Sequence, residues 1–382
     1  MKKVLFLATN DFNRFGGGGQ AIRAYLDSTL EIFGKDKVDV MVGTEYVMLD
    51  EYEDLNFIHV CKRNALISRL EVLCGYLDRW VTPLIKYLKK HRNEYDLVII
   101  NSGRMGVAVP SIKNLGLKVV TIHHNEEVEY CMDNKHLTTF GGRWDYLVRH
   151  AQCLAYKYSD INFFLTQRDC ELLHFMYGEN RKVNEIIGVY DYRTAAVIAP
   201  LQKGKEFHIG ITGSLGNYQT THGIMDIKNN YWDILMNLIP NLKLIMTGRD
   251  PSSEIMRFGN EHRDIITVVS SPQNIISVIQ KASIYLSPTD IGGGLKLRAM
   301  DGLKSGMPVL AHKVSARGYD MFLGKPYFRV YHDRYSFKQG LSDILKFVSG
   351  ASVQDRVTIC QDFYKFFSYQ AGTERVKKVL KE

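Results

Sequence analysis

Short apolar segments alternate with amphipathic segments along this chain, and the alternation restricts the possible fold more than any other feature. Apolar runs such as 4–8, 97–100 and 207–211 are too short for helices and suit strands that are buried on both faces. Between them, segments such as 20–33 carry apolar residues at helical spacing. Strands and helices in this order form parallel sheets that are covered by helices. The sequence therefore predicts an α/β protein.

The alternating pattern occurs twice, which indicates two domains. A stretch with proline, lysine and glycine at residues 200–205 separates the two sets, and 382 residues are enough for two cores. We therefore expect two Rossmann-like domains whose parallel sheets face a cleft. Residues 1–202 would form the first domain and residues 203–352 the second, with helices in residues 353–382 that return to the first domain.

The strongest functional signal is a run of three glycines that leads directly into a segment of helical pattern. The glycines occupy residues 292–294, and the segment carries Lys296, Arg298 and Asp301. Glycine lets the backbone approach a ligand, and a helix start offers unpaired N–H groups and the positive end of a dipole. Two cations, and a carboxylate about two turns into the helix, suit a bound diphosphate and a sugar diol. A tight turn without a ligand and a solvated Asp301 are the alternatives.

Further candidates follow from the rule that ligands bind beyond the carboxyl ends of parallel strands. In the second domain, polar residues and glycines end the expected strands at Gly213, Ser214, Arg249 and Ser271. We expect them to line one side of the cleft.

In the first domain, His123 and His124 end an expected buried strand. One of them is expected to act in the cleft, with His123 preferred and His124 close behind. A satisfied structural histidine is the alternative reading.

A glycine loop in the first domain is expected to approach the cleft from the other side, and it consists of Gly16, Gly17, Gly18 and Gly19. A rival interpretation is a dinucleotide fingerprint, because Gly16, Gly18 and Ala21 fit G-x-G-x-x-A and Glu45 follows the next strand. Seven residues separate these glycines from the strand, whereas a dinucleotide fingerprint lies in the strand-to-helix turn itself. NAD binding is therefore the less favoured reading, and no cofactor is expected.

Composition excludes several classes of protein. The net charge of +8 lies mainly after residue 204, which fits an anionic ligand, but no zinc-finger, helix-turn-helix or aromatic–basic pattern indicates nucleic acid. The six cysteines form no CxxC pair, so we expect reduced thiols and a cytoplasmic location. No metal-ligand spacing appears, so we expect no metal dependence. No apolar run approaches the ~20 residues that span a bilayer, and the apolar N-terminal run is read as a first strand rather than a signal peptide.

Residues 62–92 are rich in basic side chains and contain two acidic ones, Glu71 and Asp78. With Tyr76, Leu77 and Trp80 nearby, this segment suggests peripheral contact with the anionic inner face of a membrane. The alternative is a helix pair that packs on the core with leucines on one face and leaves a solvated basic face.

Residues 292–320, GGGLKLRAMDGLKSGMPVLAHKVSARGYD, resemble the C-terminal signature of glycosyltransferase family 4, in its triple-glycine branch. The segments HIGITGSLGNY, LKLIMTGRDP, IYLSPTDIGGG and VVTIHHNEEVEY are also similar to this family. The resemblance is strong over residues 205–320 and weaker over residues 1–180. It implies the GT-B fold and the transfer of a sugar from a nucleotide-sugar donor, with retention of configuration, to a glycan or lipid-linked acceptor.

The resemblance also implies roles for single residues. Asp301 falls on the second glutamate of the family motif, which binds the ribose hydroxyls, and Gly293 falls on the first, so that carboxylate is absent here. Gly294 and Leu295 would offer backbone N–H groups to the diphosphate. Lys296 and Arg298 would replace cations that the loop 213–221 lacks. Of His123 and His124, one would contact the transferred sugar.

Two other functions stay open. One is a nucleotide-sugar epimerase of similar fold. The other is a partner subunit without activity, because Asp replaces Glu at residue 301 and the loop cations are absent.

Overall fold

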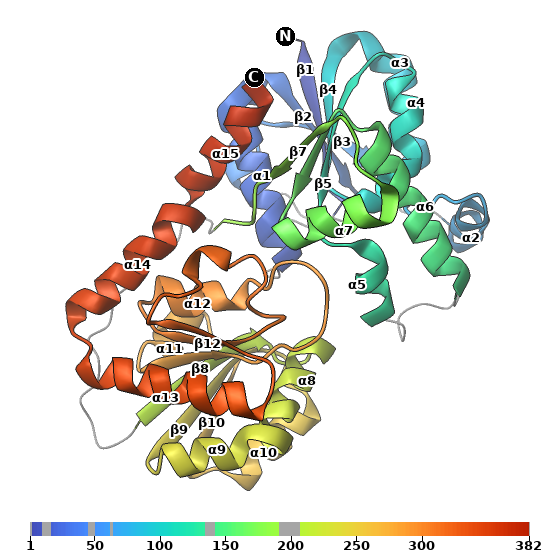
Figure 1. Ribbon diagram of the computed structural model, residues 1–382. Helices are drawn as coiled ribbons and strands as arrows, with labels where there is room; N and C mark the ends of the chain where they lie inside the picture. Colours follow the sequence, from blue (N-terminus) through green and yellow to red (C-terminus); the bar gives the residue numbers. More distant parts are fainter. Residues whose placement is uncertain are drawn as a thin grey trace. The chain divides into compact units, whose positions relative to one another are not determined.

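The computed structural model describes residues 2–9, 17–44, 50–61, 64–133, 142–190 and 207–381. It divides into two compact units, each built on a parallel sheet (Figure 1). Unit 1 contains residues 1–192 and 369–382, and unit 2 contains residues 193–368. The expected boundary at residue 202 lies outside the described residues, and the expected domain limits stay a prediction.

Unit 1 has a seven-stranded sheet in the order β3-β2-β1-β4-β5-β6-β7, and all its strand pairs are parallel. Its strands are β1 (Lys3–Leu7), β2 (Val38–Gly43), β3 (Asn56–Val60), β4 (Tyr95–Ile100), β5 (Lys118–His123), β6 (Ile161–Phe164) and β7 (Val183–Ile186). Its helices are α1 (Gly17–Phe33), α2 (Ala65–Leu73), α3 (Val81–His91), α4 (Val109–Lys113), α5 (Glu127–Asp133), α6 (Gly142–Tyr158), α7 (Gln167–Tyr177) and α15 (Tyr369–Lys381), with the short 3-10 helix η4 (Gly103–Ala108) after β4.

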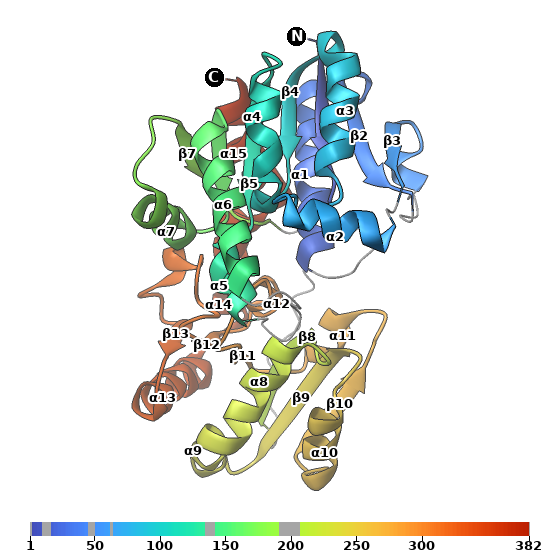
Figure 2. The same cartoon turned by 90° about the vertical axis from the view of Figure 1, so that its right-hand side faces the viewer.

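Helices cover both faces of the unit 1 sheet. Figure 2 shows α3, α4 and α6 on the near face and α1 and α15 on the far face. On one face, alternate residues of β1, β4 and β5 pack with α3, η4 and α4 into a core that includes Leu5, Val98, Trp80 and Leu84. On the other face, α15 packs along α1.

Polar contacts fix α15 to unit 1. The Ser28 hydroxyl on α1 lies 2.5 Å from the Tyr190 hydroxyl and 2.8 Å from Thr373 Oγ1 on α15. Arg375 on α15 donates a hydrogen bond from Nε to the Ile187 carbonyl. Because these groups are buried or nearly so, each needs its partner.

Unit 2 has a six-stranded parallel sheet in the order β10-β9-β8-β11-β12-β13. Its strands are β8 (Phe207–Ser214), β9 (Leu242–Arg249), β10 (Ile266–Ser270), β11 (Ile284–Ser287), β12 (Val309–His312) and β13 (Phe328–Tyr331). Its helices are α8 (Tyr218–Asp226), the π-helical turn η6 (Ile227–Tyr231), α9 (Trp232–Leu238), α10 (Ser253–Glu261), α11 (Ile275–Ile279), α12 (Arg298–Lys304), α13 (Arg334–Gly350) and α14 (Val353–Phe367).

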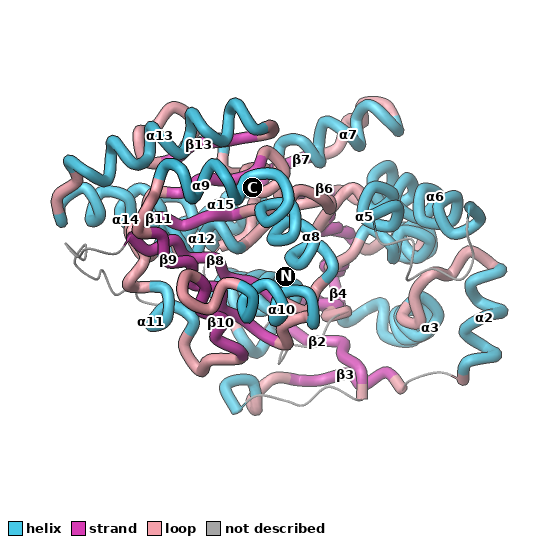
Figure 3. The backbone as a smooth tube through the Cα atoms, turned by 90° about the horizontal axis from the view of Figure 1, so that it is seen from below, coloured by secondary structure: helices cyan, strands magenta, loops and turns pink. Residues whose placement is uncertain are grey.

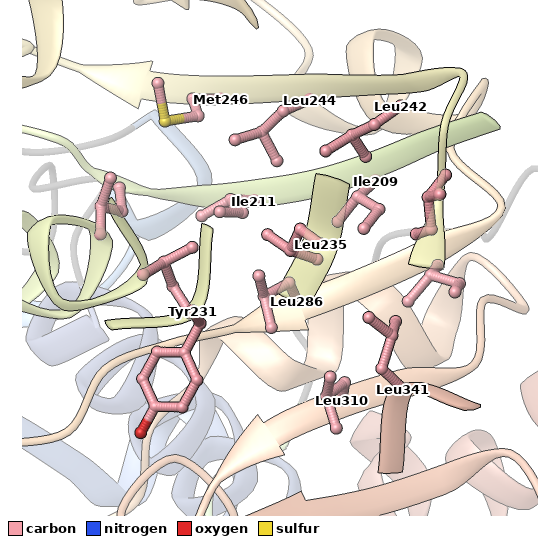
Figure 4. Close-up of a cluster of buried hydrophobic side chains, with 14 of the residues drawn as sticks. Ile209, Ile211, Tyr231, Leu235, Leu242, Leu244, Met246, Leu286, Leu310 and Leu341 are labelled. Carbon is pink, nitrogen blue, oxygen red and sulfur yellow. The ribbon is translucent and has the colours of Figure 1, made fainter. Parts of the chain in front are cut away.

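The core of unit 2 lies between the sheet and the helices α8, α9, α10 and α13. Side chains of β8, β9, β11 and β12 point toward Leu235 of α9 and Leu341 of α13 (Figure 4). α12 lies against β8, β11 and β12, and α14 packs on α12. Arg356 of α14 is buried and donates hydrogen bonds to the carbonyls of Ser305 and Gly306, which follow α12. These bonds hold the turn after α12 in place.

Candidate active site

The topology of unit 2 locates a candidate binding site. From β8 the chain moves outward to β9 and β10, whereas from β11 it moves in the opposite direction to β12 and β13. The order therefore reverses between β8 and β11. In open parallel sheets, ligands bind beyond the carboxyl ends of the strands at such a switch point. The triple-glycine segment lies in the loop that follows β11 and so belongs to this point.

The helix after the glycines begins later than the sequence suggested. α12 starts at Arg298, four residues beyond Gly294, and Asp301 lies in its first turn rather than two turns inside it. Gly292 and Gly294 have φ values of 100° and 67°, a left-handed backbone that side chains disfavour. This backbone forms an irregular loop before the helix. The glycines therefore shape a loop, and the expectation of a helix that starts directly after them was wrong.

Asp301 is held at the switch point by a chain of hydrogen bonds that we call the Tyr285–Thr212–Asp301 chain. Thr212 Oγ1 on β8 donates to Asp301 Oδ2 at 2.6 Å and lies 2.7 Å from the hydroxyl of Tyr285 on β11. Because a threonine hydroxyl has one proton, Tyr285 must donate in the second bond. Burial, and then the charge of Asp301, raise the pKa of Tyr285, so it keeps its proton. The chain therefore ties α12 to both strands of the switch point.

Two cations lie within salt-bridge distance of the same carboxylate. Arg298 Nη1 is 3.5 Å from Asp301 Oδ2, and Lys304 Nζ is 3.7 Å from Asp301 Oδ1. About 14% of the Asp301 side chain is exposed, so its oxygens can still accept hydrogen bonds from a ligand. The carboxylate is thus oriented rather than solvated.

Lys296 closes the glycine loop. Its Nζ donates to the Gly293 carbonyl at 2.9 Å and to Gln219 Oε1 on α8 at 3.2 Å, while its own carbonyl accepts a hydrogen bond from Tyr319. Arg317 also reaches the loop, with Nη1 2.9 Å from the Gly292 carbonyl. The loop is therefore bordered by two cations that an anionic ligand would meet.

The other predicted donor-side residues lie at the ends of neighbouring strands. Gly213 and Ser214 end β8, and Arg249, which is exposed, ends β9 beside Ser214. Ser271 follows β10, where its N–H donates to the Gly248 carbonyl. These residues share the carboxyl-end edge of the sheet with Asp301, and their part in ligand binding stays a prediction.

In unit 1, His123 is the last residue of β5 and is fully buried. Its Nε2 lies 3.0 Å from Oδ1 of Asn162, whose Nδ2 donates to the Tyr156 carbonyl. Because that carbonyl can only accept, Asn162 Oδ1 must face His123, and His123 Nε2 must carry the proton. Burial lowers the pKa of His123 to about 4, so the ring is neutral. Its Nδ1 is thus left as a buried acceptor, with no partner among the described residues, beside Gly103.

His124 points to different neighbours. Its Nε2 lies 2.6 Å from Oδ1 of Asn101, which follows β4, and its ring centroid is 6.1 Å from that of Tyr25 on α1. Burial lowers the pKa of His124 to about 4 as well. β1 and β4 are the strands between which the strand order of unit 1 reverses, so Asn101 and His124 lie close to its switch point. Both histidines therefore remain candidates for contact with a substrate.

A buried acidic group follows the histidines. Glu127 begins α5, and burial raises its pKa to about 7, an effect that the charge of Arg104 opposes. Nearby Glu126 and Asp169 raise the pKa of Glu127 further. Nothing in the sequence indicated that Glu127 is buried, so it was not among the predicted site residues.

The glycine loop of unit 1 differs from expectation. Gly17, Gly18 and Gly19 form the first turn of α1, and Gly16 and Glu45 lie outside the described residues. The first turn of a helix has N–H groups without intrahelical partners. Three of the four glycines are therefore helical rather than part of a loop. Within the described ranges, no group of His, Cys, Asp and Glu is arranged to hold a metal ion.

Comparison with known proteins places this geometry in a known architecture. No protein-family model matches the chain, and no curated protein matches its sequence. In structure, it is similar to sucrose-phosphate synthase from Thermosynechococcus elongatus, with a TM-score of 0.70 and 11% identity over 100% of this chain and 98% of that one. It is also similar to Anabaena HepE in complex with UDP and glucose, with a TM-score of 0.67 and 14% identity over 100% of both chains. The apo lipopolysaccharide outer core galactosyltransferase WaaB gives a TM-score of 0.68 and 12% identity over 99% of both chains.

The chain has the GT-B fold. Within this fold, the sequence did not reveal the contacts that orient the predicted side chains: those of Thr212 and Tyr285 beside Asp301, of Gln219 with Lys296, and of Asn162 with His123. Thr212 and Tyr285 lie inside apolar runs, where alternation shows only that a side chain is buried. Their pairing depends on the adjacency of β8 and β11, which are far apart in the sequence.

Proposed function

We propose that this protein is a retaining glycosyltransferase of family 4, in the triple-glycine branch, that transfers a hexosyl group from a nucleotide-sugar donor to a hydroxyl group. The acceptor would be a glycan or a lipid-linked saccharide in polysaccharide or lipid-linked oligosaccharide synthesis, and the protein would act in the cytoplasm without a metal. The fold that it shares with HepE, which was crystallised with UDP and glucose, supports a nucleotide-sugar donor.

The observation that carries this proposal is the oriented carboxylate of Asp301 at the switch point of unit 2. A ribose diol offers two hydroxyl donors, and a carboxylate that is already held by Thr212 and Arg298 can accept them without losing side-chain freedom. Asp is one methylene shorter than the Glu of the family signature, and the bond from Thr212 fixes where its oxygens lie.

The diphosphate would lie near the glycine loop. Lys296 and Arg298, with the backbone N–H groups of Gly294 and Leu295, would stabilise the negative charge that develops as the nucleoside diphosphate leaves. Lys296 Nζ donates to the Gly293 carbonyl and to Gln219 Oε1, which places its charge at the glycine loop where the diphosphate would lie.

In unit 1, the neutral histidines would contact the transferred sugar or the reacting hydroxyl. His123 offers an acceptor nitrogen, and His124 lies nearer the switch point of unit 1, so either histidine could make this contact. Gly213, Ser214, Arg249 and Ser271 would complete the donor side.

The first test is a thermal-shift panel of UDP, GDP, dTDP and ADP and their sugars, followed by assay of the released nucleoside diphosphate. The variant Lys296→Ala should lower kcat/KM for the donor at least ~10-fold, because it removes a cation from the developing charge. Lys338→Ala, which changes an exposed lysine of α13, is the matched control and should leave donor kinetics unchanged. An isomerised nucleotide sugar without diphosphate release would identify an epimerase. No nucleotide binding at millimolar concentration would instead identify a partner subunit without activity.

A further inference from the structure

Helix α2 exposes a stripe of large apolar side chains. Leu66, Ile67, Leu70 and Leu73 are 67%, 49%, 63% and 65% exposed. The following helix behaves in the opposite way, since Val81, Leu84 and Leu88 of α3 are buried. The sequence placed the leucines of both helices on one face and left open whether that face packs on the core, which it does in α3 and does not in α2.

The stripe is a consequence of how α2 is oriented. At 100° per residue, Leu66, Leu70 and Leu73 fall on one side of the helix, and Glu71 lies ~130° around the helix from them. Glu71 faces the protein, where its Oε1 accepts a hydrogen bond from Thr82 on α3 at 2.8 Å. A surface helix of a globular protein normally buries its apolar side and exposes its polar side. α2 does the reverse, which indicates that something else covers the stripe.

The charges around the stripe have one dominant sign. Arg69 is exposed on α2, and Arg79 stacks on Trp80 in the turn that follows. Both acidic residues of this region have partners: Glu71 accepts a hydrogen bond from Thr82, and half-buried Asp78 lies near Arg104 and Arg79, while burial raises its pKa. The exposed face of α2 thus combines leucines with Arg69, as in helices that lie in an anionic membrane surface.

The position of α2 in unit 1 also fits contact with a membrane surface. It follows β3 and lies at the carboxyl-end edge of the unit 1 sheet, the edge that also carries Asn101 and His124 (Figure 2). Figure 3 shows α2 at the outer edge of unit 1, next to α3. A single protruding helix can enter the headgroup layer without displacing the rest of the unit.

We propose that α2 docks unit 1 on an anionic phospholipid membrane by inserting its leucine stripe among the headgroups. The described residues contain no helix that is long and apolar enough to cross a bilayer. The role of this docking rests on the proposed function, because docking would bring the sugar-transfer edge of unit 1 to an acceptor hydroxyl carried by a membrane lipid. Binding itself needs neither donor nor turnover, so failure of the docking and failure of the transferase proposal can be distinguished.

The test is co-sedimentation of the full chain with vesicles of phosphatidylcholine, alone or mixed with phosphatidylglycerol. The wild type should bind the mixed vesicles, and the stripe variant Leu66→Gln/Leu70→Gln/Leu73→Gln should bind at least ~10-fold more weakly, because each buried CH₂ contributes substantially to partitioning. The control variant Phe175→Gln/Leu323→Gln/Val353→Gln changes three exposed apolar side chains elsewhere and should bind like the wild type. The charge variant Arg69→Glu should lose binding to mixed vesicles in particular.

A reporter variant keeps the proposal testable if the stripe variant folds poorly. In Leu70→Trp, brominated lipids should quench the new tryptophan, since amphipathic helices lie about 5–10 Å deep at the headgroup boundary. Equal binding of wild type and a folded stripe variant, or no binding of the wild type at low salt, would overturn the proposal. Self-association that the stripe variant abolishes, without vesicle binding, would show a second copy as the occupant and would also overturn it.

Discussion

The Tyr285–Thr212–Asp301 chain allows a sharp prediction because valine has nearly the same shape as threonine. Thr212→Val removes one hydroxyl and with it two buried hydrogen bonds. Asp301 loses a donor, and the hydroxyl of Tyr285, which is fully buried, is left without the acceptor that Thr212 provided. Tyr285→Phe removes the hydroxyl at the other end, while Thr212 still donates to Asp301.

The expected costs follow from the kind of bond that is lost. A hydrogen bond to a charged group contributes about 1.5–3 kcal/mol, and a buried polar group left without a partner costs about 1–3 kcal/mol. Thr212→Val should therefore destabilise unit 2 by about 3 kcal/mol, and Tyr285→Phe by about 1 kcal/mol, the value of one neutral bond. The double variant loses both hydrogen bonds, but removing both partners of the Tyr285–Thr212 bond is nearly neutral, so the cost is that of the bond to Asp301, about 2 kcal/mol. The double variant should thus be more stable than Thr212→Val alone.

Native-state hydrogen exchange of the full chain measures this order directly, through the protected amides of β8 and α12. About 3 kcal/mol corresponds to exchange roughly 100-fold faster in Thr212→Val, and adding Tyr285→Phe should slow it again by up to ~10-fold. If the two changes add, so that the double variant exchanges faster than either single one, the hydroxyl chain does not exist as described.

Two further predictions concern other parts of the fold. Gly306→Ala should destabilise unit 2 by about 2–4 kcal/mol, because Gly306 has a φ of 67° and a Cβ there would lie 2.7 Å from the Arg356 carbonyl. The control Gly324→Ala has a φ of 83° but lies in open space, so it should cost only about 1 kcal/mol, and similar urea midpoints for the two variants would contradict this reasoning. Burial raises the pKa of Glu127 from 4.5 to about 7, so the wild type loses stability as the pH rises between these values. Glu127→Gln has no charge to bury and should therefore be more stable than the wild type by about 2–3 kcal/mol near pH 8. Urea unfolding across this pH range should show a falling curve for the wild type and a flatter one for the variant, and a less stable variant near pH 8 would refute the assignment.

The sequence was sufficient for the fold because alternating strands and helices leave few architectures open. The central strands of both sheets were predicted from their apolar runs, and the α/β architecture with two parallel sheets is confirmed. The edge strands β7 and β13 were not predicted. β7 (VNEI) and β13 (FRVY) carry polar residues between their apolar ones, so neither produces a continuous apolar run.

The candidate site was only partly predictable. The three glycines and Asp301 were found because glycine and charge are conspicuous in a sequence, and the structure places them at the switch point of unit 2. The start of α12 was misplaced because backbone torsions at Gly292 and Gly294 carry no sequence signature of their own. The sequence could not decide between a core-packed and an outward apolar face for α2, since periodicity shows that leucines share a face but not which way that face points.

The return of α15 to unit 1 affects the order in which the protein can be completed during synthesis. Residues 369–381 leave the ribosome only after the whole of unit 2, yet they supply Thr373 to a buried hydroxyl cluster on α1 and Arg375 to the carbonyl of Ile187. Until then the nascent first unit presents an uncovered α1, a surface that chaperones and proteases recognise. The unit made first is therefore the unit finished last, and premature termination within unit 2 would leave both halves incomplete.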